Sequence, residues 1–420
     1  MRELFAVRFG CGGEGVTVRD EMVTGRRLPT EIWVLIVSAF VVAVGYGLVA
    51  PALPQFARSF GVGITAASAI VSAFAGMRLL FAPISGRLVQ RLGERTVYLS
   101  GLLIVALSTG ACALAQSYWE LIVLRALGGI GSTMFTVSSL GLVIRLSPPA
   151  ERGRVSGLWS TGFLVGSLGG PLIGGAMTGL GLRLPFVIYA VALLIAAFVV
   201  YRSLRGAGPE ASVAAADVPV LSFRAALARP AYPAVLWSNF ANGVAVLGVR
   251  TALVPLLVVE VLGQSRAQAG VALTVFAAGN AAVLFAAGRI SDRLGRKPFL
   301  IAGTVVCALG TLGVGLAPGL IWLLAASFVA GLGSGLFSPA QQAAVADVIG
   351  ARARGGPVLA GYQMAGDLGT VLGPIAIGAL AQRVSFEAAL AVTALLLFAA
   401  AVVWTVVPEP SRRVESDTVP

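Results

Sequence analysis

Four charged side chains lie within long apolar stretches of the chain, where a charge is costly. They are Arg78, Arg125, Arg250 and Asp367. A charged group at the centre of a lipid bilayer costs roughly 2.5 to 3.5 kcal/mol on insertion scales, so these groups must face a shared interior or one another. Burial raises the pKa of a carboxyl group, and a neighbouring Arg lowers it. A carboxyl group that moves between two such settings would bind and release protons.

Asp367 is the only acidic residue deep within an apolar stretch. We interpret it as a proton carrier, with Arg78 and Arg125 as the cations that take part in proton coupling. A second interpretation is a permanent ion pair between Asp367 and Arg78. Both can hold, because an ion pair that breaks during a conformational change is itself a coupling device.

The composition indicates a membrane-spanning framework for these residues. Of the 420 residues, 57% are hydrophobic and only 11% are charged, and the mean hydropathy is +0.92. Such values lie outside the range of soluble globular proteins. Stretches of about 18 or more apolar residues can each cross a bilayer as a helix. Twelve such spans are predicted, at 32–50, 66–87, 97–115, 118–144, 156–178, 184–201, 232–258, 267–289, 298–316, 320–346, 357–380 and 386–407.

A polar segment divides these spans into two groups of six. Residues 202–230 mix Gly, Pro, Ser and Ala with four arginines, which is the composition of a cytoplasmic linker. The predicted regions are a disordered cytoplasmic tail at 1–30, a six-helix bundle at 31–201, the linker, a second six-helix bundle at 231–407 and a cytoplasmic tail at 408–420.

Positive charge is distributed unevenly between the two sides of the predicted spans. With both termini in the cytoplasm, the inner segments hold 23 Lys and Arg residues and the outer loops hold four. This asymmetry follows the positive-inside rule and predicts a multi-pass protein of the plasma (inner) membrane with both termini cytoplasmic. The net charge of +12 is dispersed among short loops, so nucleic acid is not expected as a partner.

The sequence offers little for cofactor chemistry. It contains no His, and its three cysteines, Cys11, Cys112 and Cys307, show no paired or ligand spacing. Disulfides, metal sites and histidine proton relays are therefore not expected. No Walker loop and no nucleophile with an adjacent base is present, so we expect neither an enzyme nor a bound cofactor.

The chain contains an internal repeat of about half its length. The segment GRLVQRLGER at 86–95 recurs as GRISDRLGRK at 288–297, 202 positions later, and Gly45 matches Gly248 at an offset of 203. Because each copy holds six spans, both have the same orientation and are related by an axis along the membrane normal. We expect an all-α integral membrane protein of twelve helices in two pseudo-symmetric six-helix bundles.

The repeated segment resembles the signature of the major facilitator superfamily, G-x-L-x-D-R-x-G-R-K, which lies between the second and third spans. The second copy matches it with Ile290 in place of Leu, whereas the first has Gln90 and Glu94 where the family has Asp and a basic residue. The resemblance implies that both segments gate the closure of the two halves, with Asp292 in the acidic role. Gly295 is expected to have a positive φ. The gating positions are Gly86, Gln90, Arg91, Gly93, Gly288, Asp292, Arg293, Gly295 and Arg296.

Glycine recurs every four residues along most of the fifth predicted span, from Gly162 to Gly174. This leaves a ridge without side chains, along which another helix can pack closely, and Pro171 allows a bend. Ordinary helix packing would explain such a ridge on its own. The full pattern, G-x8-G-x3-G-P-x2-G-G, resembles the superfamily's antiporter motif. It is formed by Gly157, Gly166, Gly170, Pro171, Gly174 and Gly175.

The fourth predicted span resembles the family's motif around a central Arg, with Arg125 in the sequence LIVLRALGGIG. The resemblance also implies that the first, fourth, seventh and tenth spans surround a central cavity. It further implies that the second and eleventh spans pack together, which would bring Arg78 close to Asp367. The three Phe candidates for the cavity could instead serve packing or face lipid. Candidate cavity residues are Tyr46, Arg125, Phe135, Asn239, Phe240, Asn242, Arg250, Phe337, Gln341 and Gln342.

The family resemblance implies a secondary active transporter. We expect proton-coupled efflux of small lipophilic compounds or drugs by alternating access, energised by a proton gradient without a cofactor. We expect the protein to be a monomer. Its expected partners are a small-molecule substrate, protons and the lipid bilayer. One alternative is a proton symporter or facilitator for a small neutral or anionic nutrient, which the excess of Arg over acidic residues in the spans favours. A second is a non-transporting membrane sensor on the same scaffold.

Overall fold

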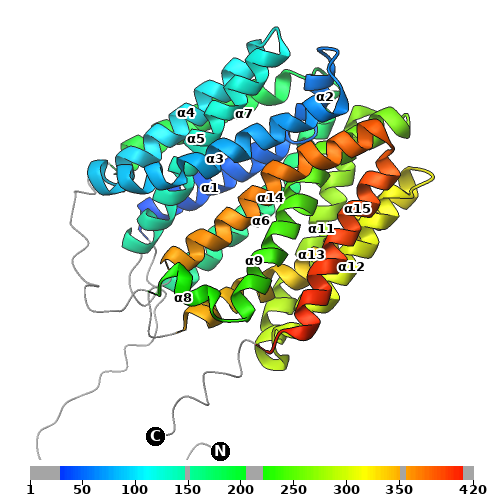
Figure 1. Ribbon diagram of the computed structural model, residues 1–420. Coiled ribbons are helices and arrows are strands. Elements are labelled where there is room, and N and C mark those ends of the chain that lie inside the picture. Colours follow the sequence, from blue (N-terminus) through cyan, green and yellow to red (C-terminus); the bar gives the residue numbers. More distant parts are fainter. Residues whose placement is uncertain (1–28, 147–151, 205–220, 351–355, 410–420) are drawn as a thin grey trace, which may run out of the picture.

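The computed structural model describes residues 29–146, 152–204, 221–350 and 356–409. Within these ranges the chain is almost entirely helical and contains no β-strand (Figure 1). The first helices are α1 (Thr30–Val49), α2 (Ala52–Arg58), α3 (Ile64–Leu92), α4 (Glu94–Leu114), α5 (Tyr118–Leu146), α6 (Arg152–Thr178) and α7 (Leu184–Ser203). A composite helix consists of α9 (Ala231–Asn242), the π-helical segment η3 (Gly243–Val249), α10 (Arg250–Leu256) and the π-helical segment η4 (Leu257–Val261). The remaining helices are α8 (Phe223–Leu227), α11 (Arg266–Leu294), α12 (Lys297–Gly315), α13 (Leu320–Ile349), α14 (Gly356–Arg383) and α15 (Phe386–Val406).

Each half of the chain forms its own bundle. In the first bundle, α1 packs against α6 and α7, and α4 packs against both α5 and α7. In the second bundle, α12 packs against both α13 and α15, and α14 packs against α9 and η3. Figure 1 shows the two bundles side by side, the first coloured blue to cyan and the second green to red. The predicted all-helical fold of two bundles is confirmed.

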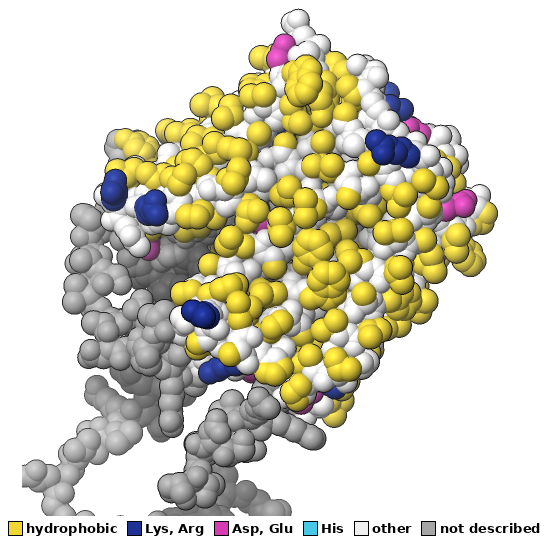
Figure 2. All heavy atoms as spheres, viewed as in Figure 1, with side chains coloured by type: hydrophobic (Ala, Val, Ile, Leu, Met, Phe, Trp, Pro, Cys, Tyr) yellow, Lys and Arg dark blue, Asp and Glu magenta, His cyan; other side chains and the backbone are white. Residues whose placement is uncertain are grey.

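Eleven of the described helices are long and apolar enough to cross a membrane. The predicted span 156–178 corresponds to α6, which falls outside this set because its glycine and serine residues lower its hydropathy. With 27 residues, α6 still has the length of a spanning helix and packs along α1. Figure 2 shows a face covered mostly by hydrophobic side chains, with nearly all visible charged ones near its margins. Lipid tails would cover such a surface.

The predicted tails and linker are described only in part. Residues 1–28, 205–220 and 410–420 lie outside the described residues, and with them most of the predicted tails and linker. The end of the predicted linker contains α8, a helix of five residues. Its N-cap is Ser222, whose hydroxyl oxygen accepts a hydrogen bond from the Ala225 N–H at 3.2 Å.

The glycine ridges bring matched pairs of helices into close contact. A Cβ atom built on Gly170 of α6 would lie 2.5 Å from the carbonyl oxygen of Val44 in α1. A Cβ atom built on Gly373 of α14, 203 positions later, would lie 2.9 Å from the Cα atom of Val244 in η3. Real Cβ atoms do not approach other atoms this closely, so only glycine allows these helix pairs to pack as they do.

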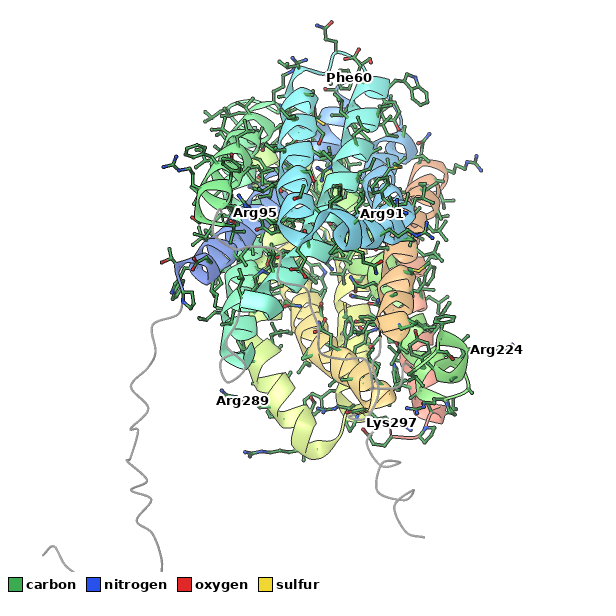
Figure 3. All side chains as sticks on the ribbon, turned by 90° about the vertical axis from the view of Figure 1, so that its left-hand side faces the viewer. Phe60, Arg91, Arg95, Arg224, Arg289 and Lys297 are labelled. Carbon is green, nitrogen blue, oxygen red and sulfur yellow. The ribbon has the colours of Figure 1, made fainter. Side chains whose placement is uncertain are left out.

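The two ends of the molecule are named here after Thr30, where α1 begins, and Arg58, where α2 ends. Figure 3 shows Phe60 at the Arg58 end and Arg289 and Lys297 at the opposite end. The bundles contact each other through α2 with α10, α3 with α14 and α6 with α11.

The closest of these contacts lie towards the Arg58 end. Cβ atoms built on Gly175 of α6 and Gly378 of α14 would lie 2.7 Å from Gly270 of α11 and 2.9 Å from Ser68 of α3. The repeat relates Gly175 to Gly378 and Ser68 to Gly270, so the two contacts are equivalent. The interface therefore follows the internal symmetry.

Two polar contacts join the bundles at the Arg58 end. The Nε of Arg58 donates a hydrogen bond to Oε1 of Glu260 at 2.7 Å. The Oε1 of Gln382 accepts a hydrogen bond from the backbone N–H of Thr65 at 2.9 Å, in the first turn of α3. Together with the glycine contacts, these bonds close the bundles against each other at this end.

Candidate transport cavity

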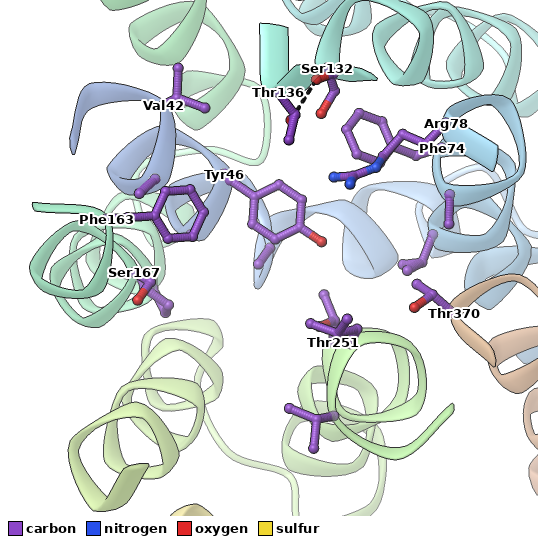
Figure 4. Close-up of a pocket in the computed structure, with 18 of the residues that line it drawn as sticks. Val42, Tyr46, Phe74, Arg78, Ser132, Thr136, Phe163, Ser167, Thr251 and Thr370 are labelled. Atoms are coloured by element: carbon purple, nitrogen blue, oxygen red, sulfur yellow. Dashed lines mark hydrogen bonds between the residues drawn. The ribbon is translucent and has the colours of Figure 1, made fainter. Parts of the chain in front are cut away.

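A cavity of about 470 Å³ lies between the two bundles. This volume is within the range of pockets that hold drug-sized molecules. Its lining residues come mainly from α1, α3, α5 and α6 of the first bundle and from η3, α10, α11 and α14 of the second. Figure 4 shows Tyr46 and Arg78 pointing into it, with Phe163 and Ser167 of α6 on one side and Thr370 of α14 on another.

The structure brings Asp367 and Arg78 together across the boundary between the bundles. The Nη2 of Arg78 in α3 lies 4.0 Å from Oδ1 of Asp367 in α14, and both residues line the cavity. Their side chains are 27% and 19% exposed. The separation is at the upper limit for an ion pair, so the two groups attract each other without a close hydrogen bond. The two groups can therefore separate without breaking a hydrogen bond between them.

Arg125 and Arg250 are held in a different way, each over an aromatic ring. The Cζ of Arg125 lies 4.2 Å from the ring centroid of Phe74, and the Cζ of Arg250 lies 3.9 Å from that of Phe276. Both arginines are only 4% exposed. Phe74 in α3 and Phe276 in α11 are 202 positions apart, so the repeat supplies the same aromatic platform in each bundle.

Neither of these two arginines has a carboxylate partner within 4.0 Å among the described residues. Among these described residues, Nε of Arg125 and both Nε and Nη1 of Arg250 are buried without a hydrogen-bond partner. Cation–π attraction offsets only part of the cost of burying a guanidinium group. Among the described residues, both of these cavity-lining arginines therefore keep buried N–H groups without a protein partner.

The predicted cavity residues divide into two sets. Those that line the cavity are Tyr46, Arg125, Phe135, Asn239 and Arg250. Those outside its lining in this conformation are Phe240, Asn242, Phe337, Gln341 and Gln342.

The second set lies on other faces of its helices. Phe337 is 1% exposed within the core of the second bundle, and Phe240 stacks on Trp237 with a centroid separation of 5.6 Å. Gln341 is fully buried, and its Nε2 donates a hydrogen bond to the carbonyl of Val235 at 3.4 Å. Position along a span does not reveal which face of the helix meets the cavity.

The first signature segment ends α3 at the Thr30 end. Gly93 has φ +79°, which favours glycine, and a Cβ atom on Gly86 would meet nothing within 4 Å. Gln90 and Arg91 are exposed. The gating role of these residues stays a prediction.

The second signature segment turns at Gly295, whose φ of +97° confirms the expected positive value. Nε of Arg296 donates to Oδ2 of Asp347 in α13 at 3.3 Å, and the backbone N–H of Arg296 donates to Oε1 of Glu409 at 2.7 Å. These contacts fix the turn within the second bundle. Gly288 lies on α11 beside Pro339. The side chain of Asp292 lies outside the described residues, and Arg293 is exposed.

The antiporter-like motif occupies the face of α6 that contacts two other helices. Gly166, Gly170 and Gly174 pack against α1, and a Cβ atom on Gly174 would lie 2.1 Å from the carbonyl oxygen of Leu48. Pro171 lines the cavity and touches the position of Gly47, and Gly175 meets α11 of the other bundle. The surroundings of Gly157 lie outside the described residues. A change in the angle between the bundles would therefore alter the contacts of this motif.

Several cavity residues escaped sequence reasoning. They include Phe74, Phe276, Asn280, Gln363 and Thr370. One signal could have found the two aromatic residues. The offset of 202 that relates the signature segments also pairs Phe74 with Phe276 on the spans that precede those segments. No comparable pattern singles out the polar residues, because each lies among small and apolar neighbours.

Comparison with known proteins now places the chain. A family model described as Major Facilitator Superfamily matches residues 35–256 and 235–420. The chain is 30% identical over 281 residues to the tetracycline resistance protein, class C, of Escherichia coli, covering 64% of this chain and 69% of that protein. It is 31% identical over 169 residues to the quinolone resistance protein NorA of Staphylococcus aureus, covering 40% of this chain and 43% of NorA. The latter match thus spans less than half of NorA's length.

Solved structures share the fold. A bacterial homolog of the human lysosomal transporter Spinster, in an inward-facing and unoccupied conformation, superposes with a TM-score of 0.77 at 17% identity, covering 93% of this chain and 98% of that one. The inward-facing and occupied conformation superposes with a TM-score of 0.73 at 16% identity, covering 90% and 96%. With its many apolar helices, the protein is a multi-pass membrane transporter rather than an enzyme. The chain belongs to the Major Facilitator Superfamily.

Proposed function

We propose that this transporter exports small lipophilic compounds in exchange for protons. The observation that carries the proposal is the position of Asp367, the single acidic residue among the described residues that line the cavity, with Arg78 opposite it at 4.0 Å. The mostly apolar lining suits a lipophilic substrate. The relatives named for quinolone and tetracycline resistance support the same class of substrate.

Proton binding by Asp367 would release Arg78, because a neutral carboxyl group no longer attracts the guanidinium group. The pair joins α3 to α14, so its loss removes one attraction between the bundles. A basic group of a substrate would compete with the proton for the same carboxylate. Proton and substrate would then occupy the site in turn, which is the requirement for exchange.

The Thr30 end is assigned to the cytoplasm by the positive-inside rule, because the signature segments with their arginines lie there. In this orientation, in the plasma (inner) membrane, the contacts at the Arg58 end close the outer side. The structure is then an inward-facing conformation of a monomer, ready to take up its substrate from the cytoplasm. Rocking of the two bundles about the cavity would open the outer side in turn.

Uptake of radiolabelled tetracycline into inverted membrane vesicles tests the proposal. Proton pumping into the vesicles is expected to drive accumulation, and a protonophore is expected to abolish it. The variant Asp367→Asn keeps the size and polarity of the side chain but binds no proton at physiological pH. It should lose proton-driven accumulation while still exchanging labelled for unlabelled substrate, at a lower affinity because the amide no longer attracts a basic group of the substrate. Glu387→Gln is a matched control, since this acid-to-amide change lies on the exposed start of α15. Undiminished accumulation by Asp367→Asn would exclude the proposed carrier.

Proton symport of an anionic compound is a second candidate function, because the described residues that line the cavity include three arginines and one aspartate. The same vesicles distinguish the two modes. A symporter would empty preloaded vesicles when their interior is acidic, whereas an exchanger would fill them. A sensor on this scaffold would show neither net movement nor exchange of substrate.

A further inference from the structure

We propose that Arg250 binds the carboxylate of the transported compound, so that preferred substrates are lipophilic acids that also carry a basic amine. This inference rests on the proposed function, because it names the substrate class of the same cavity. It starts from an imbalance of charge: Arg78, Arg125 and Arg250 line the cavity, and Asp367 is the only carboxylate among its described lining residues. Two positive charges therefore remain uncompensated.

Arg250 is the arginine with the greatest unmet bonding capacity. It is 4% exposed, and both its Nε and its Nη1 are buried without a hydrogen-bond partner in the described part of the chain. The ring of Phe276 lies under the guanidinium group, with its centroid 3.9 Å from Cζ, and takes up none of its N–H groups in a conventional hydrogen bond. A buried cation without a counter-charge is costly, and an anionic ligand would remove that cost.

The other two arginines are less suited to this role. Arg78 already faces Asp367 at 4.0 Å. Arg125 has one buried nitrogen without a partner where Arg250 has two. Nε and Nη1 lie on different edges of the guanidinium group, and each can donate a charge-assisted hydrogen bond to an anionic acceptor. The two unpartnered donors and the missing counter-charge favour an anionic group of the ligand at Arg250.

The position of Asp367 adds the second requirement, a basic amine. Arg250 belongs to α10 and Asp367 to α14, and these helices pack together within the second bundle. One bundle thus presents a cation and an anion to the same cavity. A purely acidic ligand would bind best when Asp367 is protonated, which favours cotransport with a proton rather than exchange. A basic amine on the same molecule would restore competition with the proton at Asp367.

Equilibrium binding to the purified full-length protein tests the inference without a proton gradient. The probes are ciprofloxacin, which carries a carboxylate and a basic amine, and ciprofloxacin methyl ester, which lacks only the carboxylate charge. Arg250→Gln is expected to weaken binding of the acid by roughly ten- to a hundred-fold, since a hydrogen bond to a charged group is lost. Binding of the ester should change by less than about twofold. Retained ester binding shows that the cavity is still folded.

Arg183→Gln provides a matched control. Arg183 also lies over a Phe ring, with its Cζ 5.6 Å from the centroid of Phe56, but it is outside the cavity lining. The Arg183→Gln variant should leave the ratio of acid to ester affinity unchanged. An unchanged ratio in Arg250→Gln, or a larger loss of the ratio in Arg125→Gln, would overturn the assignment.

Arg250→Lys provides a second test in case Arg250→Gln does not fold. Arg250→Lys keeps the positive charge but lacks the guanidinium fork. It should still lower the ratio of acid to ester affinity, and an unchanged ratio would contradict hydrogen bonding of the carboxylate by the guanidinium group. Because no transport is measured, failure of proton-driven uptake in vesicles would contradict the proposed function and leave this result intact.

Discussion

The variant Gly270→Ala should shift the protein away from the conformation described above. A Cβ atom at position 270 would lie 2.3 Å from the carbonyl oxygen of Pro171 and 2.5 Å from the Cα of Gly175. Ordinary contacts of a Cβ begin near 3.4 Å, so α6 and α11 must separate by about 1 Å. Both neighbours are backbone atoms of a long helix, so rotation of a side chain cannot relieve the clash.

The expected size of the shift follows from the cost of overpacking. Forcing an extra methyl group into a close contact typically costs about 1 to 3 kcal/mol. The two conformations of an alternating-access protein differ by only a few kcal/mol, so the ratio of their populations should change by roughly 5- to 150-fold. The clash exists only where the bundles meet at the Arg58 end. The penalty therefore applies to the closed state of that end.

Labelling of a single cysteine measures this shift. In a background without Cys11, Cys112 and Cys307, a cysteine replaces Thr251, which lines the cavity. A membrane-impermeant maleimide is added to right-side-out and to inverted vesicles. Gly270→Ala should raise the labelling rate from the Arg58 side and lower it from the Thr30 side.

Gly169→Ala is the control for this experiment, because a Cβ atom at that position of α6 would meet nothing within 4 Å. It should label like the parent. If Gly270→Ala labelled like Gly169→Ala from both sides, the glycine contact would not control closure, and the reasoning from contact distance would fail.

Three further predictions follow from contacts described above. Arg58→Gln should favour opening of the Arg58 end by about 0.2 to 1 kcal/mol, as expected for a partly exposed ion pair, and the double variant Arg58→Glu, Glu260→Arg should restore the parent labelling pattern. Glu409→Ala should lower the melting temperature in detergent, because Oε1 and Oε2 of Glu409 accept hydrogen bonds from the backbone N–H groups of Arg296 and Lys297 at the start of α12. Such caps contribute about 0.5 to 2 kcal/mol to stability. An unchanged melting temperature would contradict the assigned role. Phe276→Leu should weaken ciprofloxacin binding by roughly 2- to 30-fold through loss of the platform under Arg250; equal affinity would show that the ring does not position the guanidinium group.

Hydropathy and repetition were sufficient to predict the architecture. Apolar stretches locate the spanning helices because each must cover the thickness of a bilayer, and the offset of 202 revealed the second copy. The closeness of Arg78 and Asp367 followed from the family resemblance, and the structure places them 4.0 Å apart. Charged residues within a span are predictable in this way, because they must find a polar surrounding wherever the helices permit one.

The lining of the cavity was harder to predict, because it depends on how each helix is rotated about its axis. Phe337 and Gln341 lie on the correct span but face the core of the second bundle. The composite helix adds a further difficulty, since η3 interrupts the regular spacing of an α-helix just before Arg250. Hydrogen bonds from i to i+5 change the direction in which later side chains point. The apolar composition of this span does not indicate a π-helical segment.

The paired aromatic rings separate what the two halves share from what they do not share. The rings occupy matched positions in the two halves, but their arginines do not. At the offset of 203 that relates Gly45 to Gly248, Arg125 corresponds to Phe328 and Arg250 to Gly47. A gene encoding two identical halves would have carried each arginine twice. The two copies therefore share their helical framework and their aromatic rings but differ in charge, so a change of charge in one half leaves the framework common to both halves intact.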